Sequence, residues 1–293
     1  MTTDLDLKQY LQKQRLLVEK ALETALPEIE GREARVVEAM RYSLFAGGKR
    51  LRPILCLAAA QAVAGTIEAA MPAACALEMI HTYSLIHDDL PAMDDDDLRR
   101  GKPTSHAVFG EAIAILAGDA LLTEAFVLLS DYNGSLAKRA LKLIGVIARA
   151  ASYRGMVGGQ VVDMLSQNNE TVQQMHSRKT AALISAATEA GALAGGGTDD
   201  QVEALARYGR AIGLAFQIAD DILDIEGSTE VLGKTAGSDV ARGKVTYPAA
   251  VGLEGSRQAA QTLVNQALAA LERFDNKAEP LRALADYIIA RKK

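Results

Sequence analysis

The chain has 293 residues, a formal net charge of −5 at pH 7 and no tryptophan. It has no run of basic residues interleaved with aromatics, so we expect no binding to nucleic acid. The N-terminus lacks the apolar core of a signal peptide and the longest apolar runs are short for a bilayer, so we expect a cytoplasmic protein with no membrane span.

Apolar residues recur at helical spacing along most of the chain, and no segment shows the alternation typical of a strand. The composition is 49% hydrophobic but only 4% aromatic, which favours helices that pack closely through small side chains. No linker divides the chain, so we predict an all-α protein with a single domain over residues 1–293. The predicted helices are 4–25, 32–46, 51–64, 69–89, 110–132, 136–150, 152–167, 171–177, 179–195, 198–225, 246–253, 256–273 and 278–290.

Two connectors between the predicted helices are long and rich in charge and glycine, at residues 90–109 and 226–245. Long connectors in a compact fold tend to be functional. Each of these two directly follows an acidic motif, so we expect the chemistry of the protein to lie near both.

The first of three motifs along the chain is basic. It joins the second and third predicted helices, where residues 47–53 read Gly-Gly-Lys-Arg-Leu-Arg-Pro. A Gly-Gly turn leaves backbone N–H groups available to an anion beside the lysine and arginine side chains. This segment therefore predicts an anion site.

The second motif is acidic, and residues 87–97 read His-Asp-Asp-Leu-Pro-Ala-Met-Asp-Asp-Asp-Asp. So many carboxylates next to an apolar helix make a strong negative field that cations would neutralise, and hard oxygen ligands suit Mg²⁺. Pro91 cannot continue a regular helix, so a bend there could bring Asp94 back to face the same ions as Asp88. The alternative interpretation is a solvated acidic loop.

The third motif lies within an apolar helix, where residues 217–224 read Gln-Ile-Ala-Asp-Asp-Ile-Leu-Asp. Asp220 and Asp224 are four residues apart and share one helix face, and Gln217 lies one turn before Asp220. Like charges at this spacing destabilise a helix slightly, which implies a compensating cation. A solvated helix face remains the alternative.

Basic residues complement these acids. Arg99 and Arg100 follow the first acidic run, and their planar guanidinium groups suit diphosphate oxygens. Lys179, Lys234 and Lys244 are spread through the second half, where each alone would be an ordinary solvated lysine. Together the acids and bases are typical of a pocket that holds carboxylates, divalent ions and two diphosphates.

In order and approximate spacing, these motifs resemble those of the trans-prenyl diphosphate synthases: Gly-Gly-Lys-Arg-x-Arg-Pro at 47–53, Asp-Asp-x4-Asp at 88–94, Lys-Thr at 179–180 and Phe-Gln-x2-Asp-Asp-x2-Asp at 216–224. The extra residues inside the first aspartate motif resemble the bacterial farnesyl diphosphate synthases in particular. The resemblance spans nearly the whole chain. It implies the isoprenoid synthase fold, an antiparallel helix bundle around a deep central cavity, paired as a homodimer.

The resemblance also implies a cofactor and residue roles. Mg²⁺ is the implied cofactor, with Asp88 and Asp94 as ligands of two ions and Asp220 as a ligand of a third. The other implied catalytic acids are Asp89, Asp221 and Asp224, and the last two would act through bound water. The implied contacts of the allylic diphosphate are Arg99, Lys179 and Lys234, and Lys244 is a further implied substrate contact. The implied contacts of isopentenyl diphosphate are Gly48, Lys49, Arg52, His81 and Arg100. Thr180 and Gln217 would lie near the developing cation.

Two of these assignments have ordinary alternatives. Without the resemblance, His81 would be interpreted as a common buried or capping histidine. The basic C-terminus at 291–293 is a candidate to close over the second diphosphate, although such termini are more often frayed.

The implied reaction explains why these residue types are needed. Ionisation of dimethylallyl or geranyl diphosphate leaves a diphosphate and a carbocation, so metal ions and basic side chains must stabilise the leaving group. Water would quench the cation, so the prenyl chain needs an apolar cavity. Isopentenyl diphosphate then attacks through its double bond and loses a proton, which gives farnesyl diphosphate after two rounds.

The alternatives are a synthase of geranylgeranyl or longer diphosphates, a class I terpene cyclase, and a non-catalytic helical subunit. A cyclase would carry an Asn/Ser/Glu metal motif in the second half, and a non-catalytic relative usually loses one aspartate motif. We expect a C15 product, because Tyr83 and Ser84 lie about one turn before Asp88, where a bulky tyrosine could floor the cavity. The alternative is a C20 product.

Overall fold

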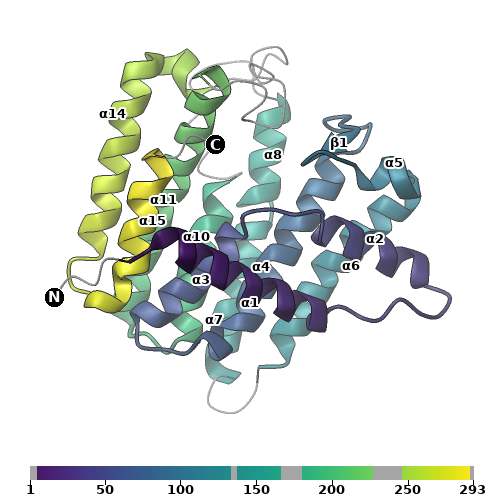
Figure 1. The fold of residues 1–293 in the computed structure, drawn as a ribbon, viewed down its shortest axis with the longest axis horizontal. Helices are drawn as coiled ribbons and strands as arrows, with labels where there is room; N and C mark the ends of the chain where they lie inside the picture. The colour runs from purple at the N-terminus through teal and green to yellow at the C-terminus, as the bar shows by residue number, and fades with distance from the viewer. Residues whose placement is uncertain (1–4, 133–136, 166–179, 227–245, 291–293) are drawn as a thin grey trace.

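The computed structural model describes residues 5–132, 137–165, 180–226 and 246–290. These residues are overwhelmingly helical, as predicted (Figure 1). The helices are α1 (Leu7–Ala25), α2 (Ala34–Leu44), α3 (Leu51–Ala62), α4 (Ile67–Asp88), α5 (Ser105–Phe109), α6 (Glu111–Ser130), α7 (Ala137–Ala151), α8 (Met156–Leu165), α10 (Ala181–Ala194), α11 (Asp199–Glu226), α14 (Tyr247–Ala270) and α15 (Glu279–Ala290), with a 3-10 turn, η3, at Asn276–Ala278.

The helices pack in an order that places α4 near the middle of the bundle. α4 packs against α3 and α6, α3 packs against α10, and α10 packs against α11, which in turn packs against α14. In Figure 1, α11 and α14 run side by side on one side of the molecule, and α6 lies on the other. The helix that carries the first acidic motif is therefore enclosed by neighbours along most of its length.

Small side chains explain the close packing of these central helices. α3 buries the run from Cys56 to Ala60 completely, and α4 buries the run from Ala73 to Ala76 almost completely. Alanines allow helix axes to approach closely while still removing apolar surface from water. The buried apolar residues form one continuous cluster that extends from α1 to α15. Within this cluster the buried Tyr208 hydroxyl donates to the Leu281 carbonyl oxygen at 2.7 Å, which joins α11 to α15.

The long connector after the first acidic motif contains structure that the sequence analysis did not predict. Leu98–Arg99 (β1) pairs antiparallel with Lys102–Pro103 (β2), and α5 follows. The expectation of no strand is therefore wrong at this hairpin, because two-residue strands are too short for alternation to be visible. The turn places Arg100 and Gly101 at φ 54° and 74°.

Helix boundaries differ from the predicted ones at a few places. The helices predicted at 246–253 and 256–273 together correspond to α14, which is interrupted at Gly252, where φ 75° and ψ 165° are non-helical; the prediction placed this break slightly later, at 254–255. Helix α8 begins at Met156 rather than at 152. The helix predicted at 171–177 and nearly all of the connector at 226–245 lie outside the described residues.

Helix α6 does not fit the expectation that every apolar run is too short for a bilayer. Among the described residues, it is the one helix whose length and composition would allow a membrane crossing, with a mean hydropathy of 2.0 over a window that is 33% buried. Core helices can pass the same test, and α6 packs on α4 along one face. Its outer face leaves Ile115, Leu116 and Val127 exposed by 42%, 54% and 48%.

Candidate active site

The first acidic motif begins where α4 ends. Pro91 stops the helix, and the chain folds back so that the Asp94 amide donates to the Asp88 carbonyl oxygen at 2.8 Å. A second backbone hydrogen bond joins the Asp96 amide to the Asp89 carbonyl oxygen at 3.2 Å. The bend after Pro91 thus brings Asp94 next to Asp88, in agreement with the arrangement expected from the sequence.

Asp89 has a different environment from its neighbour Asp88. Its side chain is buried, and Arg99 Nε donates to its Oδ1 at 2.6 Å. Arg99 also lies 3.6 Å from Asp96 through Nη2. The acidic loop therefore holds Arg99 in place beside the motif, and Asp89 acts as its anchor.

The hairpin turn brings Arg100 to the Gly-Gly segment. The Arg100 guanidinium donates to the Gly47 carbonyl oxygen. Gly48 has a φ of 130°, and a Cβ at this position would lie 2.7 Å from Arg100 Nη1. Glycine is favoured here because other residues rarely adopt this backbone, and a side chain at this position would displace the Arg100 guanidinium. Two segments that the sequence assigns to the isopentenyl diphosphate site are therefore adjacent.

Arg52 lies at the start of α3, directly after the Gly-Gly segment, and His81 lies on α4. Burial lowers the pKa of Arg52, and Asp220 on α11 is one of the carboxylates that partly offset it. Burial, together with Arg52 and Arg100, lowers the pKa of His81 well below its usual 6.5, so the imidazole is neutral at pH 7. Asp220 of the second acidic motif thus lies within electrostatic reach of Arg52 in the Gly-Gly-Lys-Arg-Leu-Arg-Pro segment at 47–53, here called the anion loop.

The second acidic motif belongs to a chain of hydrogen bonds that joins three helices. Thr180 Oγ1, at the start of α10, donates to Gln217 Oε1 at 2.7 Å, and Gln217 Nε2 donates to Asp221 Oδ1 at 3.0 Å. Asp221 Oδ2 accepts from the Tyr247 amide at 2.7 Å, where α14 begins. Asp221 is buried, so the chain fixes the orientation of the Gln217 amide and the Thr180 hydroxyl.

An apolar cavity of about 590 Å³ opens beside the first acidic motif. Helices α4 and α8 form its long walls, and Ile115 of α6 also contributes to the lining. Polar residues from the predicted site lie at its margin, and methionines and valines line the rest. The lining residues are Arg52, His81, Tyr83, Ser84, Leu85, His87, Asp88, Leu90, Ala92, Met93, Ile115, Met156, Val157, Gln160, Val161, Met164 and Thr180.

Tyr83 and Ser84 both line this cavity, as the sequence analysis predicts. Tyr83 is 7% exposed, and its ring meets the His87 ring edge-on with the centroids 5.7 Å apart. The Ser84 hydroxyl donates to the His81 carbonyl oxygen at 2.8 Å, so it is satisfied within its own helix. A large ring and a small side chain thus stand next to each other on the cavity wall.

Comparison with known proteins agrees with this arrangement. Residues 33–287 match the family model described as polyprenyl synthetase. The chain belongs to the polyprenyl synthetase family. It is 50% identical to large subunit 1 of a heterodimeric geranylgeranyl pyrophosphate synthase from Arabidopsis thaliana chloroplasts, covering 98% of this chain and 80% of that protein. It is also 50% identical to a dimethylallyltranstransferase from Fischerella ambigua, covering 98% and 84%.

Solved structures show the same fold. An FPP/GFPP synthase from Zymomonas mobilis superposes with a TM-score of 0.86 at 41% identity, covering 97% of this chain and 99% of that chain. A geranylgeranyl pyrophosphate synthetase from Pyrococcus horikoshii superposes with a TM-score of 0.87 at 31% identity, covering 97% and 98%. The fold is therefore the isoprenoid synthase fold, and this polyprenyl synthetase is a prenyltransferase that makes trans-prenyl diphosphates.

The cavity also contains polar residues that the sequence analysis missed. Gln160 on α8 lines it, and in the described part of the chain its buried Oε1 has no hydrogen-bond partner. His87 lies on the opposite wall, with Nε2 3.1 Å from the Ile115 carbonyl oxygen. Gln160 could have been noticed in the sequence as a polar residue within the apolar run of α8. His87 was overlooked because the adjacent aspartates were the more obvious candidates for function.

The acidic residues of this polyprenyl synthetase fit Mg²⁺ by their chemistry. Asp88 ends α4 and its carbonyl oxygen accepts from the Asp94 amide, while Asp220 lies on α11 within electrostatic reach of Arg52. Carboxylate oxygens are the hard ligands that Mg²⁺ prefers. Over the ranges that the structure describes, no three His, Cys, Asp or Glu side chains already form a closed metal cluster.

Several of the predicted diphosphate contacts cannot be compared with the structure. Lys179, Lys234 and Lys244, together with the basic C-terminus at 291–293, lie outside the described residues. Their assignment to diphosphate oxygens stays a prediction.

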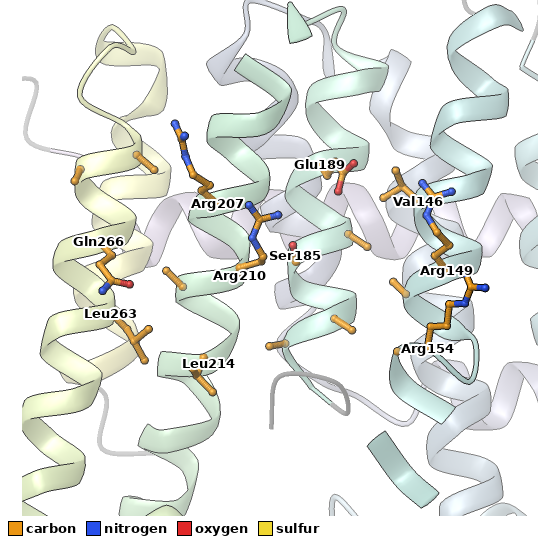
Figure 2. Close-up of a pocket in the computed structure, with 18 residues that line it drawn as sticks. Val146, Arg149, Arg154, Ser185, Glu189, Arg207, Arg210, Leu214, Leu263 and Gln266 are labelled. Carbon is orange, nitrogen blue, oxygen red and sulfur yellow. The ribbon is translucent and has the colours of Figure 1, made fainter. Parts of the chain in front are cut away.

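A larger hollow of about 950 Å³ lies elsewhere, among α7, α10, α11 and α14. Figure 2 shows that arginines from α11 and from the α7 side lie around it, with Glu189 and Ser185 on α10 between them. Arg207 and Arg210 are exposed, and Arg210 Nη2 pairs with Glu203 at 2.9 Å. No residue of the acidic motifs lines this hollow, so we do not assign the active site to it.

Proposed function

We propose that this polyprenyl synthetase condenses isopentenyl diphosphate with dimethylallyl diphosphate and then with geranyl diphosphate, and releases farnesyl diphosphate. The observation that supports a C15 product is the position of Tyr83. Its ring, 7% exposed, forms part of the wall of the apolar cavity on the helix that ends at Asp88. Because α4 rises about 1.5 Å per residue, Tyr83 lies roughly 7.5 Å along the axis from Asp88, where the tail of a growing chain would meet it.

The proposed reaction assigns a role to each part of the site. Bound at Asp88, Asp94 and Asp220, Mg²⁺ would neutralise the charge that grows on the departing diphosphate. Arg99, anchored by Asp89, would donate to the same diphosphate. The methionines and valines of α8 would exclude water from the allylic cation.

The oxygens of Thr180 and Gln217 would stabilise the cation. The hydrogen bond between them, at 2.7 Å, keeps both near the cavity margin. Preorganised dipoles stabilise developing charge without reorganising during the reaction. The departed diphosphate is the favoured acceptor for the proton that isopentenyl diphosphate loses after attack.

A C20 product is the second candidate. The relatives named geranylgeranyl pyrophosphate synthases are 50% and 51% identical to this chain, which favours geranylgeranyl diphosphate. The name of the Zymomonas mobilis structure gives two products, FPP and GFPP, and does not favour a single chain length. Tyr83 favours C15 on steric grounds. The two candidates share every step before the last condensation.

Product analysis tests the proposal directly. The purified protein would be incubated with isopentenyl and dimethylallyl diphosphates and Mg²⁺, and the products identified by mass after dephosphorylation. We expect farnesol as the main alcohol. Geranylgeraniol as the main alcohol would establish the C20 candidate, and the absence of any prenyl product would overturn the proposed reaction.

We also propose that the protein is a homodimer in which α6 contacts its copy. Ile115, Leu116 and Val127 are exposed on one face of α6, whereas the opposite face packs on α4. Large apolar side chains exposed on the face away from the core are candidates for an interface between subunits. Ile115 also lines the active-site cavity, so the interface would lie next to it.

A further inference from the structure

One residue of the anion loop points away from the site that its neighbours form. Arg50 is 2% exposed, whereas the preceding Lys49 is exposed. Arg50 also adopts a left-handed backbone, with φ 53° and ψ 35°, at the position just before α3 begins. Non-glycine residues seldom adopt this conformation, so the surrounding contacts must hold it.

The guanidinium group of Arg50 joins three helices. Nη1 donates to Glu78 Oε1 on α4 at 2.8 Å, and Nη2 donates to the carbonyl oxygen of Leu44, the last residue of α2, at 2.7 Å. Nε lies 3.7 Å from Glu19 Oε1 on α1, too far for a hydrogen bond. Glu78 is 2% exposed, so the Arg50–Glu78 pair is an ion pair away from solvent.

Glu78 also acts on the arginines of the predicted isopentenyl diphosphate site. Burial lowers the pKa of Arg52 and of Arg100, and in each case Glu78 is the carboxylate that offsets this effect most. Glu78 therefore lies within electrostatic reach of three guanidinium groups and forms its hydrogen bond with Arg50. A diphosphate that binds near Arg52 and Arg100 would compete with this carboxylate if Arg50 were absent.

We propose that the Arg50–Glu78 ion pair positions the anion loop for the homoallylic diphosphate. The pair clamps the start of α3 to α4, so that Lys49 and Arg52 are held on the ligand side of the loop. It also keeps Glu78 engaged, so that this carboxylate does not draw Arg52 and Arg100 away from the ligand. The inference rests on the proposed function, because the diphosphate contacts of this loop are themselves proposed.

Arg50→Met tests the clamp. Methionine fills similar space without a charge, which leaves Glu78 to attract Arg52 or Arg100 instead. We expect the KM for isopentenyl diphosphate to rise about tenfold or more, while the KM for geranyl diphosphate changes less than about twofold. An unchanged KM for isopentenyl diphosphate, or an equal rise for both substrates, would overturn the proposal.

The double variant Arg50→Met/Glu78→Gln isolates the effect of charge. It removes the competing carboxylate, and replacing both members of a buried ion pair is commonly tolerated by the fold. We expect the double variant to recover isopentenyl diphosphate affinity several-fold relative to the single variant. If the double variant binds isopentenyl diphosphate no better than Arg50→Met does, the proposal that Glu78 competes with the ligand for Arg52 and Arg100 is wrong.

Two further variants control for stability. Tyr208→Phe removes a buried hydrogen bond to Leu281 at the α11–α15 contact, far from the loop in the chain. It should lower the melting temperature and leave both KM values unchanged. If Arg50→Met does not fold, Arg50→Lys keeps the charge but cannot donate to Glu78 and Leu44 as a fork, and a several-fold rise in the KM for isopentenyl diphosphate is still expected.

Calorimetric titration with isopentenyl diphosphate separates this inference from the proposed reaction. Suppose that the wild-type protein forms no prenyl product but binds isopentenyl diphosphate, and that Arg50→Met binds it about tenfold more weakly. The proposed role of the Arg50–Glu78 ion pair is then supported, and the proposed reaction is wrong. If wild-type protein turns over normally and the affinity of Arg50→Met is unchanged, the clamp alone is wrong.

Discussion

At the scale of single residues, neighbouring acids in the same motif have different environments. Asp89 is buried and binds Arg99, whereas the bend after Pro91 brings the backbone of Asp94 to that of Asp88. A run of aspartates in the sequence does not distinguish an acid that anchors a side chain from one that serves a metal ion. The contact with Arg99 identifies Asp89 as an acid that anchors a side chain, and the roles of Asp88 and Asp94 at metal ions stay a prediction.

We expect Asp88→Ala and Asp220→Ala each to reduce turnover by about a hundredfold or more, because each would remove a ligand of the ions that stabilise the leaving group. Helix content by circular dichroism should not change, since neither side chain belongs to the hydrophobic core. Asp131→Ala at the end of α6 is the matched control and should leave turnover unchanged. Near-normal turnover of Asp88→Ala at saturating Mg²⁺ would contradict the metal assignment.

His81 predicts a pH dependence of stability. Burial and the nearby arginines hold its pKa in the folded protein well below 6.5, its ordinary value in the unfolded chain. Below pH 6.5 the unfolded chain therefore binds more protons than the folded protein, so the free energy of unfolding falls as the pH falls. Urea unfolding at several pH values should show a shallower fall for His81→Asn, and identical slopes for the two proteins would contradict the assignment.

At the scale of elements, α4 carries both the chemistry and the proposed limit on product length. Its C-terminal end bears Asp88, and one turn earlier Tyr83 and Ser84 line the cavity wall opposite α8. The same helix holds Glu78 and His81 near the anion loop. A single buried helix thus sets the spacing between the two proposed diphosphate sites and the cavity.

We expect Tyr83→Ala to lengthen the product beyond C15, because it removes a ring from the cavity wall, and Ser84→Phe to shorten it towards C10. The product alcohols would be compared by mass spectrometry, with Thr82→Ala as a control on the same helix, since Thr82 does not line the cavity. An unchanged product distribution in both variants, with lowered melting temperature, would mean that the two residues only pack between helices.

At the scale of the whole molecule, the exposed stripe of α6 predicts assembly. Sedimentation of the wild-type protein should give twice the chain mass of 31.1 kDa. Leu116→Glu and Val127→Glu should each shift the protein towards the monomer, because a buried unpaired charge at an interface is unfavourable. Leu16→Glu, at an equally exposed apolar residue of α1, should not. A wild-type monomer would contradict the homodimer, and the cytoplasmic location stays a prediction.

Much of the fold was predictable because helical periodicity is a local signal. The long helices from α1 to α6 and from α10 to α11 lie close to their predicted bounds, since apolar spacing and Gly or Pro punctuation mark them in the sequence. The hairpin at 98–103 was missed because its two strands are too short for a pattern. The break within α14 was predicted at 254–255 and lies at Gly252, because Gly252 and Gly255 are close together and the sequence alone does not say which of them leaves the helical conformation.

By itself, the sequence determined the class of fold, the family motifs and the residue types of the site, because these depend on local spacing and on side-chain chemistry. Tertiary structure decided which of these residues meet. Arg100 contacts Gly47 across 53 positions, and Thr180 binds Gln217 across 37. It also decided that Arg50 faces Glu78 inside the protein while Lys49 faces out, since burial and partners depend on how α2, α3 and α4 pack, and no local pattern records that packing.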